Sequence, residues 1–189
     1  YHSNREYEKF TATEHDIDIV YLTFDELMKL YKYEFDNDRQ SHVRDFFCIG
    51  CFTGLRFSDL SRLHLANITE EHIVISIQKT KTQNHSIKLN KYAKEILEKY
   101  KGSIYEPLPK ISSQKFNDYI KECCELAEIT QPITIHWFVG TEKKTLTQPK
   151  CKFVSSHIAR KTFITNSLLL GMEPKAIKQI ANIKKDEVL

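Results

Sequence analysis

The stretch Thr53-Gly54-Leu55-Arg56-Phe57-Ser58-Asp59-Leu60-Ser61-Arg62-Leu63 is the most informative part of the sequence. The residues before it, 46–52, are too apolar for a surface segment, which predicts a helix buried on most sides. Gly54 is expected to end that helix, because glycine adopts a positive φ without steric cost. A second helix is expected beyond it, with Ser58 or Asp59 in its first turn. Arg56 is therefore predicted at a buried junction, where a guanidinium needs a carboxylate, a carbonyl cluster or a phosphate as its partner.

The size and composition of the chain indicate a single globular domain. A chain of 189 residues suffices for one well-packed core and is short for two. Its 28% charged and 41% hydrophobic residues are unlike those of a disordered chain. The net charge of +3 permits a nucleic-acid partner but does not by itself indicate one. No apolar run approaches the ~20 residues that cross a bilayer, and no signal peptide is visible, so we expect a soluble protein without membrane contacts.

The cysteines are unlike a secreted disulfide framework. They are odd in number and lie mostly in apolar helical contexts, at Cys48, Cys51, Cys123, Cys124 and Cys151. This usage indicates a reducing compartment, so we expect a cytoplasmic location. The first two form a C-x-x-C motif, but it lies inside a Phe-rich helix without a second ligand pair of matching spacing. We therefore interpret these cysteines as small buried hydrophobic residues rather than as a zinc or redox site.

Helical patterns cover most of the chain. A first helix is expected from Thr23, where Glu26 completes a capping box, to residues 36–38, which close it. A second helix is expected from about Ser41 into the opening stretch. Further helices are predicted after Asn90, after residues 112–113, and over residues 157–170 and 174–180.

Two segments show the alternation of β-strands. Residues 72–82 alternate apolar and polar side chains, Gln83-Asn84 is a plausible turn, and residues 85–89 alternate again. Lys79 and Lys81 would lie on the same strand face near the end of this hairpin. Residues 133–139 and 151–154 are also β-like, around a polar, charged loop. The predicted fold class is α+β, mainly α-helical, with a small antiparallel β-sheet.

A second informative cluster is Ser155-Ser156-His157-Ile158-Ala159-Arg160-Lys161. Residues three and four apart share a helix face, so His157 and Arg160 are expected to project together. Serine is a common first residue of a helix, and a helix N-terminus offers free N–H groups and a positive dipole end. Basic residues are electrostatically unfavourable there, which favours an anionic ligand over a merely solvated turn.

Arg56, the hairpin lysines, His157 and Arg160 are the residue types that a scissile phosphodiester requires. Two arginines can bind the non-bridging oxygens, and a lysine or histidine can move a proton at the attacking or leaving oxygen. No pair of carboxylates with metal-ligand spacing accompanies them in the sequence. This set therefore predicts phosphoryl transfer without a metal.

In their order along the chain, T-G-L-R-F-S-D-L, the lysine-bearing hairpin and H-I-A-R resemble the catalytic domain of the tyrosine recombinases, the phage integrase family. The resemblance extends from about Thr23 to the end, and the sequences of these motifs are most similar to those of integrases of Bacteroides-type mobile elements. It implies site-specific DNA recombination through a 3′-phosphotyrosyl intermediate, with Arg56, His157 and Arg160 catalytic and Asp59 supporting them.

The resemblance is weaker at three positions. The catalytic lysine could be Lys79, which matches the family spacing from Arg56, or Lys81, which lies in a T-K-T context. Asn182 stands where the family has its second histidine, and an amide can donate a hydrogen bond but cannot carry a proton. The nucleophilic tyrosine is expected just after Leu189, so the 189-residue chain would bind DNA without cleaving it.

The resemblance also implies an organisation and partners. Residues 1–22 are interpreted as a linker from a preceding core-binding domain, and 23–189 as a catalytic domain that stops before the nucleophile. The expected partner is double-stranded DNA, bound as a homotetramer in the bacterial cytoplasm, while the isolated fragment would be a monomer. Two alternatives stay open: a non-cleaving DNA-binding relative, and a helical interaction domain with accidental motif matches. Basic residues expected along the DNA backbone are Lys143, Lys144, Lys150, Lys152 and Lys161.

Overall fold

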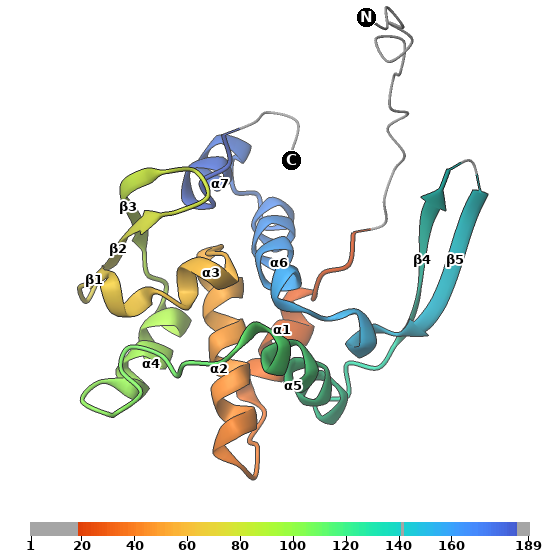
Figure 1. The fold of residues 1–189 in the computed structure, drawn as a ribbon, viewed down its shortest axis with the longest axis horizontal. Helices are drawn as coiled ribbons and strands as arrows, with labels where there is room; N and C mark the ends of the chain where they lie inside the picture. The colour runs from red at the N-terminus through yellow and green to blue at the C-terminus, as the bar shows by residue number, and fades with distance from the viewer. Residues whose placement is uncertain (1–18, 141, 185–189) are drawn as a thin grey trace, which may run out of the picture.

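A computed structural model describes residues 19–140 and 142–184 of the chain; it shows a mainly helical fold with two small antiparallel sheets (Figure 1). The expectation for residues 1–22 falls largely outside the described residues. The helices are α1 (Phe24–Lys32), α2 (Asp38–Thr53), α3 (Phe57–Leu60), α4 (Lys91–Tyr100), α5 (Ser113–Leu126), α6 (Ser156–Leu169) and α7 (Pro174–Ile180), with short 3-10 helices η2 (Leu63–Leu65) and η3 (Lys150–Phe153). The predicted fold class is confirmed.

Helix α2 is the centre of the core, and α1, α4, α5 and α6 pack around it (Figure 1). Its residues 45–53 are all buried, as the apolar sequence predicted. Gly54 ends α2 with a φ of 70°, the left-handed conformation that glycine tolerates. The predicted start at Ser41 was wrong by one turn. The side chain of Asn37 accepts a hydrogen bond from the Gln40 N–H, so residues expected to close α1 instead begin α2.

Helix α1 begins as the capping pattern predicted. Thr23 accepts from the Glu26 N–H, and the Glu26 carboxylate accepts from the Thr23 N–H, at 3.2 and 2.7 Å. The preceding residue is bound to α6, because the Leu22 N–H donates to Thr162 Oγ1 at 3.0 Å and Asn166 donates to the Leu22 carbonyl at 3.1 Å. The beginning of α1 and the middle of α6 are therefore held together through buried hydrogen bonds.

The first sheet has the order β1-β2-β3, with β1 (Asn67–Ile68), β2 (His72–Ile77) and β3 (Thr82–Lys88) all antiparallel. The turn occupies residues 78–81, so the prediction of a turn at Gln83-Asn84 was wrong. Asn84 does adopt a positive φ of 51°, but within β3, where the pairing shifts register. An asparagine that tolerates positive φ serves a bulge as readily as a turn, which explains the misplacement.

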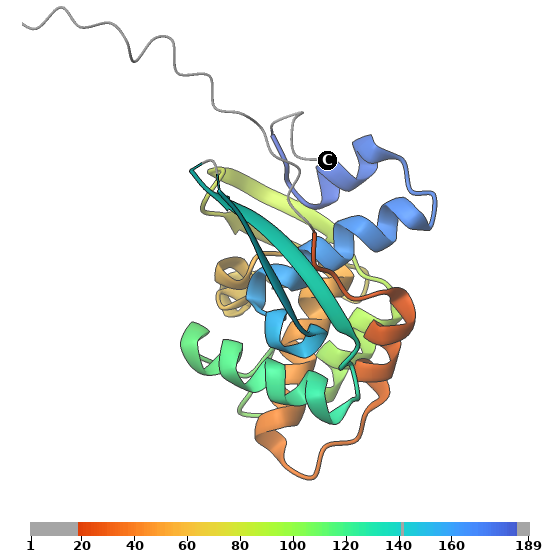
Figure 2. The ribbon, with the colours of Figure 1, turned by 90° about the vertical axis from the view of Figure 1, so that its right-hand side faces the viewer.

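A second hairpin projects from the body of the protein (Figures 1 and 2). Strand β4 (Pro132–Val139) was expected, but β5 (Glu142–Pro149) falls on residues interpreted as a polar loop. The backbone of β4 supplies the hydrogen-bonding partners that make these polar residues a strand. The segment expected to be β-like after it belongs instead to η3, which ends at Phe153.

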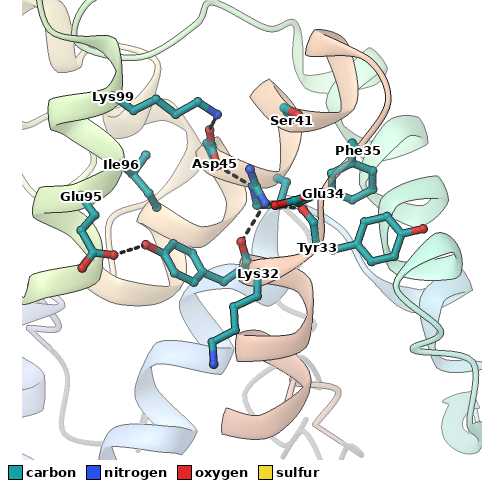
Figure 3. A pocket seen from close by; sticks show the side chains of 11 residues that line it. Lys32, Tyr33, Glu34, Phe35, Ser41, Asp45, Glu95, Ile96 and Lys99 are labelled. Carbon is teal, nitrogen blue, oxygen red and sulfur yellow. Dashed lines mark hydrogen bonds and ion pairs between the residues drawn. The ribbon is translucent and has the colours of Figure 1, made fainter.

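A buried carboxylate joins α1, α2 and α4 beside a pocket of about 380 Å³ (Figure 3). Asp45 accepts hydrogen bonds from Arg44, Lys99 and Tyr100 at 2.5, 2.7 and 2.6 Å. Arg44 also donates to the Tyr31 carbonyl at 2.7 Å. Burial and the bond to Asp45 raise the pKa of Tyr100, which keeps its hydroxyl a donor. None of the predicted site residues lines this pocket, so we assign its charged network to packing of the three helices.

All five cysteines are buried and free of disulfides. Burial raises the pKa of the Cys48 and Cys51 thiols, and that of Cys123 to about 12. Within residues 19–140 and 142–184, no group of His, Cys, Asp and Glu could hold a metal ion. Over the same residues, no helix combines the length and hydrophobicity that crossing a bilayer requires.

Candidate phosphate-binding site

Arg56 lies at the junction that follows α2, where it is the N-cap residue of α3. Its carbonyl accepts from the N–H groups of Asp59 and Leu60 at 3.0 and 2.9 Å. Ser58 and Asp59 lie in the single turn of α3, as expected, but no side chain makes a capping hydrogen bond there. Among the described residues, nothing hydrogen-bonds to Arg56 Nη1, although this atom is buried. A guanidinium N–H without a partner is directed to a ligand or is costly to the fold.

Arg160 approaches the same junction from α6. Its Nη1 donates to the carbonyl of Gly54 at 2.8 Å. Burial, and after it the neighbouring Arg56, lower the pKa of Arg160 to about 10, while Asp59 opposes both effects. The structure thus brings together two arginines that are 104 residues apart in sequence (160 − 56), as the motifs predicted. Two partly buried like charges favour an anion between them.

Asp59 supports this arginine pair from below the surface. It is 1% exposed. Burial raises the pKa of its carboxyl, and the proximity of Arg56, of the Gln78 backbone and of Arg160 opposes that rise. The Asp59 carboxyl therefore interacts electrostatically with both arginines and lies near Gln78, where the β2–β3 turn begins. Its negative charge partly offsets the positive charge of the two arginines.

Lys79 and Lys81 lie in the turn of the β2–β3 hairpin, residues 78–81, and both are exposed. The expectation that they share a strand face was wrong, because the strand ends at Ile77. Lys81 has a φ of 51° and its N–H donates to the Gln78 carbonyl at 3.2 Å. The Gln78 backbone opposes the rise that burial causes in the pKa of the Asp59 carboxyl, so this turn lies near the arginine pair. Both Lys79 and Lys81 therefore stay candidates for the catalytic lysine.

His157 is exposed in the first turn of α6, one turn before Arg160. Ser155 occupies the N-cap position of this helix, as the sequence predicted, but its hydroxyl makes no capping hydrogen bond. Instead the Ser156 N–H donates to Asn117 Oδ1 at 2.8 Å. Sequence reasoning missed Asn117, because it comes from α5 and only the tertiary structure places it there.

Asn182 follows α7 and contacts the lysine-bearing turn. Its Nδ2 donates to Thr80 Oγ1 at 2.9 Å, and its Oδ1 accepts from Thr82 Oγ1 at 3.4 Å. Lys184 Nζ donates to the Thr80 carbonyl at 2.7 Å. The T-K-T motif around Lys81 drew attention to these threonines in the sequence. The neighbouring residues did not indicate that the threonine hydroxyl groups contact Asn182.

The lysines expected along DNA differ in their surroundings. Lys150 is buried and paired with Glu26 at 2.5 Å. Lys152 pairs with Glu125 at 2.7 Å, and Lys144 with Glu142 at 2.6 Å. Lys143 and Lys161 are exposed, the first on β5 and the second beside Arg160 on α6.

The sequence model of the phage integrase family matches residues 20–188, so the chain belongs to that family.

Solved structures share the fold at low sequence identity. XerA recombinase has a TM-score of 0.61 and 17% identity over 93% of this chain and 59% of its own. The Tn1549 transposon integrase with circular intermediate DNA has a TM-score of 0.61 and 14% identity over 97% and 63%. XerH bound to its difH substrate has a TM-score of 0.58 and 13% identity over 88% and 48%. The chain thus spans about half to two thirds of these proteins. No curated protein matches the sequence.

Proposed function

We propose that this chain is the catalytic domain of a site-specific tyrosine recombinase that integrates or excises a mobile element, as the resemblance to Bacteroides-type integrases implies. The observation that carries the proposal is the pairing of Arg56 with Arg160 at the α2–α6 junction, with Asp59 behind them. Membership of the phage integrase family supports it.

In the proposed reaction, Arg56 and Arg160 bind the non-bridging oxygens of the scissile phosphate and offset the charge that develops on them. A tyrosine oxygen, which the resemblance places after Leu189, attacks the phosphorus, and the bond to the 5′-oxygen breaks. His157 accepts the proton that the tyrosine hydroxyl loses, and Lys79 or Lys81 donates the proton that the leaving 5′-oxygen needs. The products are a 3′-phosphotyrosyl link and a free 5′-hydroxyl, and the steps use no metal or nucleotide.

The proposed partner is double-stranded DNA, bound by a homotetramer in the cytoplasm. Structures of the XerH recombinase and the Tn1549 integrase contain DNA, which supports this partner. Lys143 and Lys161 are the exposed lysines best suited to reach a phosphate backbone. The charge of Lys150 is paired with that of Glu26, so Lys150 is not among the proposed DNA contacts.

The test uses the natural full-length protein and a nicked DNA substrate that traps a covalent adduct. We expect adduct formation, and a loss of about 10²–10³-fold in its rate for Arg56→Lys, which keeps the charge but not the planar fork. Lys29→Gln, which breaks an exposed ion pair with Glu128, is the control and should react normally.

Two other outcomes would replace the proposal. Tight DNA binding without an adduct would identify a non-cleaving relative, which Asn182 in place of the family histidine favours. Neither binding nor an adduct would identify a helical interaction domain.

A further inference from the structure

The side chain of Asn182 bridges the base of the turn that carries both candidate lysines. Its amide nitrogen donates to Thr80 and its oxygen accepts from Thr82, while the two threonine hydroxyl oxygens lie 2.9 Å apart. Thr80 stands between Lys79 and Lys81 in the turn. A single amide thus fixes the residues that flank each lysine, although it lies 102 positions away from Thr80 in sequence.

Further bonds join the same two segments. Lys184 Nζ donates to the Thr80 carbonyl at 2.7 Å, and His85 Nε2 donates to the Ile180 carbonyl at 2.8 Å. The end of α7 is therefore attached both to the turn and to strand β3. Figure 1 shows α7 beside this hairpin. We call these contacts of Asn182, Lys184 and His85 the α7–hairpin contacts.

The backbone at Asn182 suits this role. Its φ is 50°, a conformation that asparagine tolerates better than most residues. Its amide oxygen and one amide N–H are both engaged by the turn. The hydrogen bond that the Asn182 amide can donate is thus directed to Thr80 of the protein itself.

We propose that Asn182 is a positioning residue that holds the turn of residues 78–81, and with it the catalytic lysine, against the arginine pair. The inference rests on the proposed function. An exposed four-residue turn loses its orientation easily, and a displacement of about 1 Å at a reacting group can cost about 10²-fold in rate. Asn182 therefore acts through Thr80 and Thr82, not through contact with the DNA phosphate.

The first test measures amide hydrogen exchange of the natural full-length protein in the absence of DNA. Asn182→Gly removes the amide while suiting the positive φ, and we expect exchange in residues 78–82 to become about tenfold faster. Asn182→Asp keeps an acceptor for both threonine hydroxyl groups and should restore most of the protection. The matched control is Asn84→Gly, at φ 51° on the same hairpin, which should leave the turn nearly unchanged.

The second test measures covalent adduct formation with a double-mutant cycle. Asn182→Gly and Thr80→Val should each slow adduct formation by about 10–100-fold, and the double variant should be no slower than either. Thr80→Ser, which retains the hydroxyl group, should react nearly normally.

Two results would overturn the inference, and they are distinguishable from failure of the proposed function. Unchanged exchange in Asn182→Gly would show that the turn is not held by this residue. Additive effects in the cycle would show that Asn182 acts on the DNA independently of Thr80. A natural protein that forms no adduct would refute the proposed function, and with it the catalytic part of the inference, whatever the exchange rates show.

Discussion

Asp59 should make the stability of the fold depend on pH, because burial raises the pKa of its carboxyl. Between the ordinary pKa and the raised one, the folded state binds more protons than the unfolded state, so stability falls as pH rises through this window. We expect Asp59→Asn to lack this fall. The free energies of unfolding of the variant and of the unsubstituted protein can be measured in urea at intervals from pH 4 to pH 7. The variant should gain stability relative to the unsubstituted protein as pH rises. A difference that stays constant with pH would contradict the assignment.

Asp45 makes a prediction about stability. Its side chain is 3% exposed and neutralises Arg44 and Lys99 between the helices. Asp45→Ala leaves buried donors unpaired, so we expect a loss of about 3 kcal/mol in the free energy of unfolding. Lys99→Met is the control, because that lysine is 47% exposed and its pair should contribute under about 1 kcal/mol. Equal losses in the two variants would show that burial of the carboxylate is not what matters.

At the junction of α2 and α6, Gly54 has two reasons to be glycine. Its φ is 70°, and an added Cβ would lie 2.6 Å from the ring of Phe163. Gly102 has nearly the same φ, 71°, but nothing within 4 Å of an added Cβ. Gly102→Ala should therefore cost only the backbone strain, about 1 kcal/mol, whereas Gly54→Ala should cost about 3 kcal/mol or more. Thermal unfolding of the two variants measures the difference, and equal costs would contradict the close packing of α6.

Local signals predicted the elements whose ends are decided by neighbouring residues. The Thr23–Glu26 capping box and the Asn90 cap, which accepts from the Ala93 N–H at 3.0 Å, needed only the sequence around them. Gly54 likewise ended its helix as glycine predicts.

The misplaced elements depend on distant partners. Strand β5 is polar and becomes a strand because β4 pairs with it in register. The turn at residues 78–81 was hidden by an asparagine that occupies a bulge instead. The structure places the two motif arginines near each other. Asn117 and Thr80 were not noticed in the sequence, since their partners lie 39 and 102 positions away.

For the protein as a whole, the net charge of +3 says little about which lysines reach DNA. Lys150 and Lys161 were equal candidates in the sequence, yet one is enclosed with Glu26 and the other is exposed on α6. The arrangement of charge in the folded chain, not its sum, decides which residues are available to a polyanion. This distinction is measurable, because phosphate contacts and structural ion pairs respond differently to salt.

We expect Lys161→Gln to reduce the slope of log K against log salt for duplex DNA by about 0.9, the effect of losing one phosphate contact, with an unchanged melting temperature. Lys150→Met should leave that slope unaltered. It should lower the free energy of unfolding by about 3 kcal/mol, because it removes the ion-pair partner of Glu26, whose side chain is only 15% exposed. Fluorescence anisotropy from 50 to 200 mM salt and urea unfolding, on the natural full-length protein, measure both quantities. The opposite pattern, a reduced slope with normal stability for Lys150→Met, would show that this lysine leaves Glu26 to bind DNA.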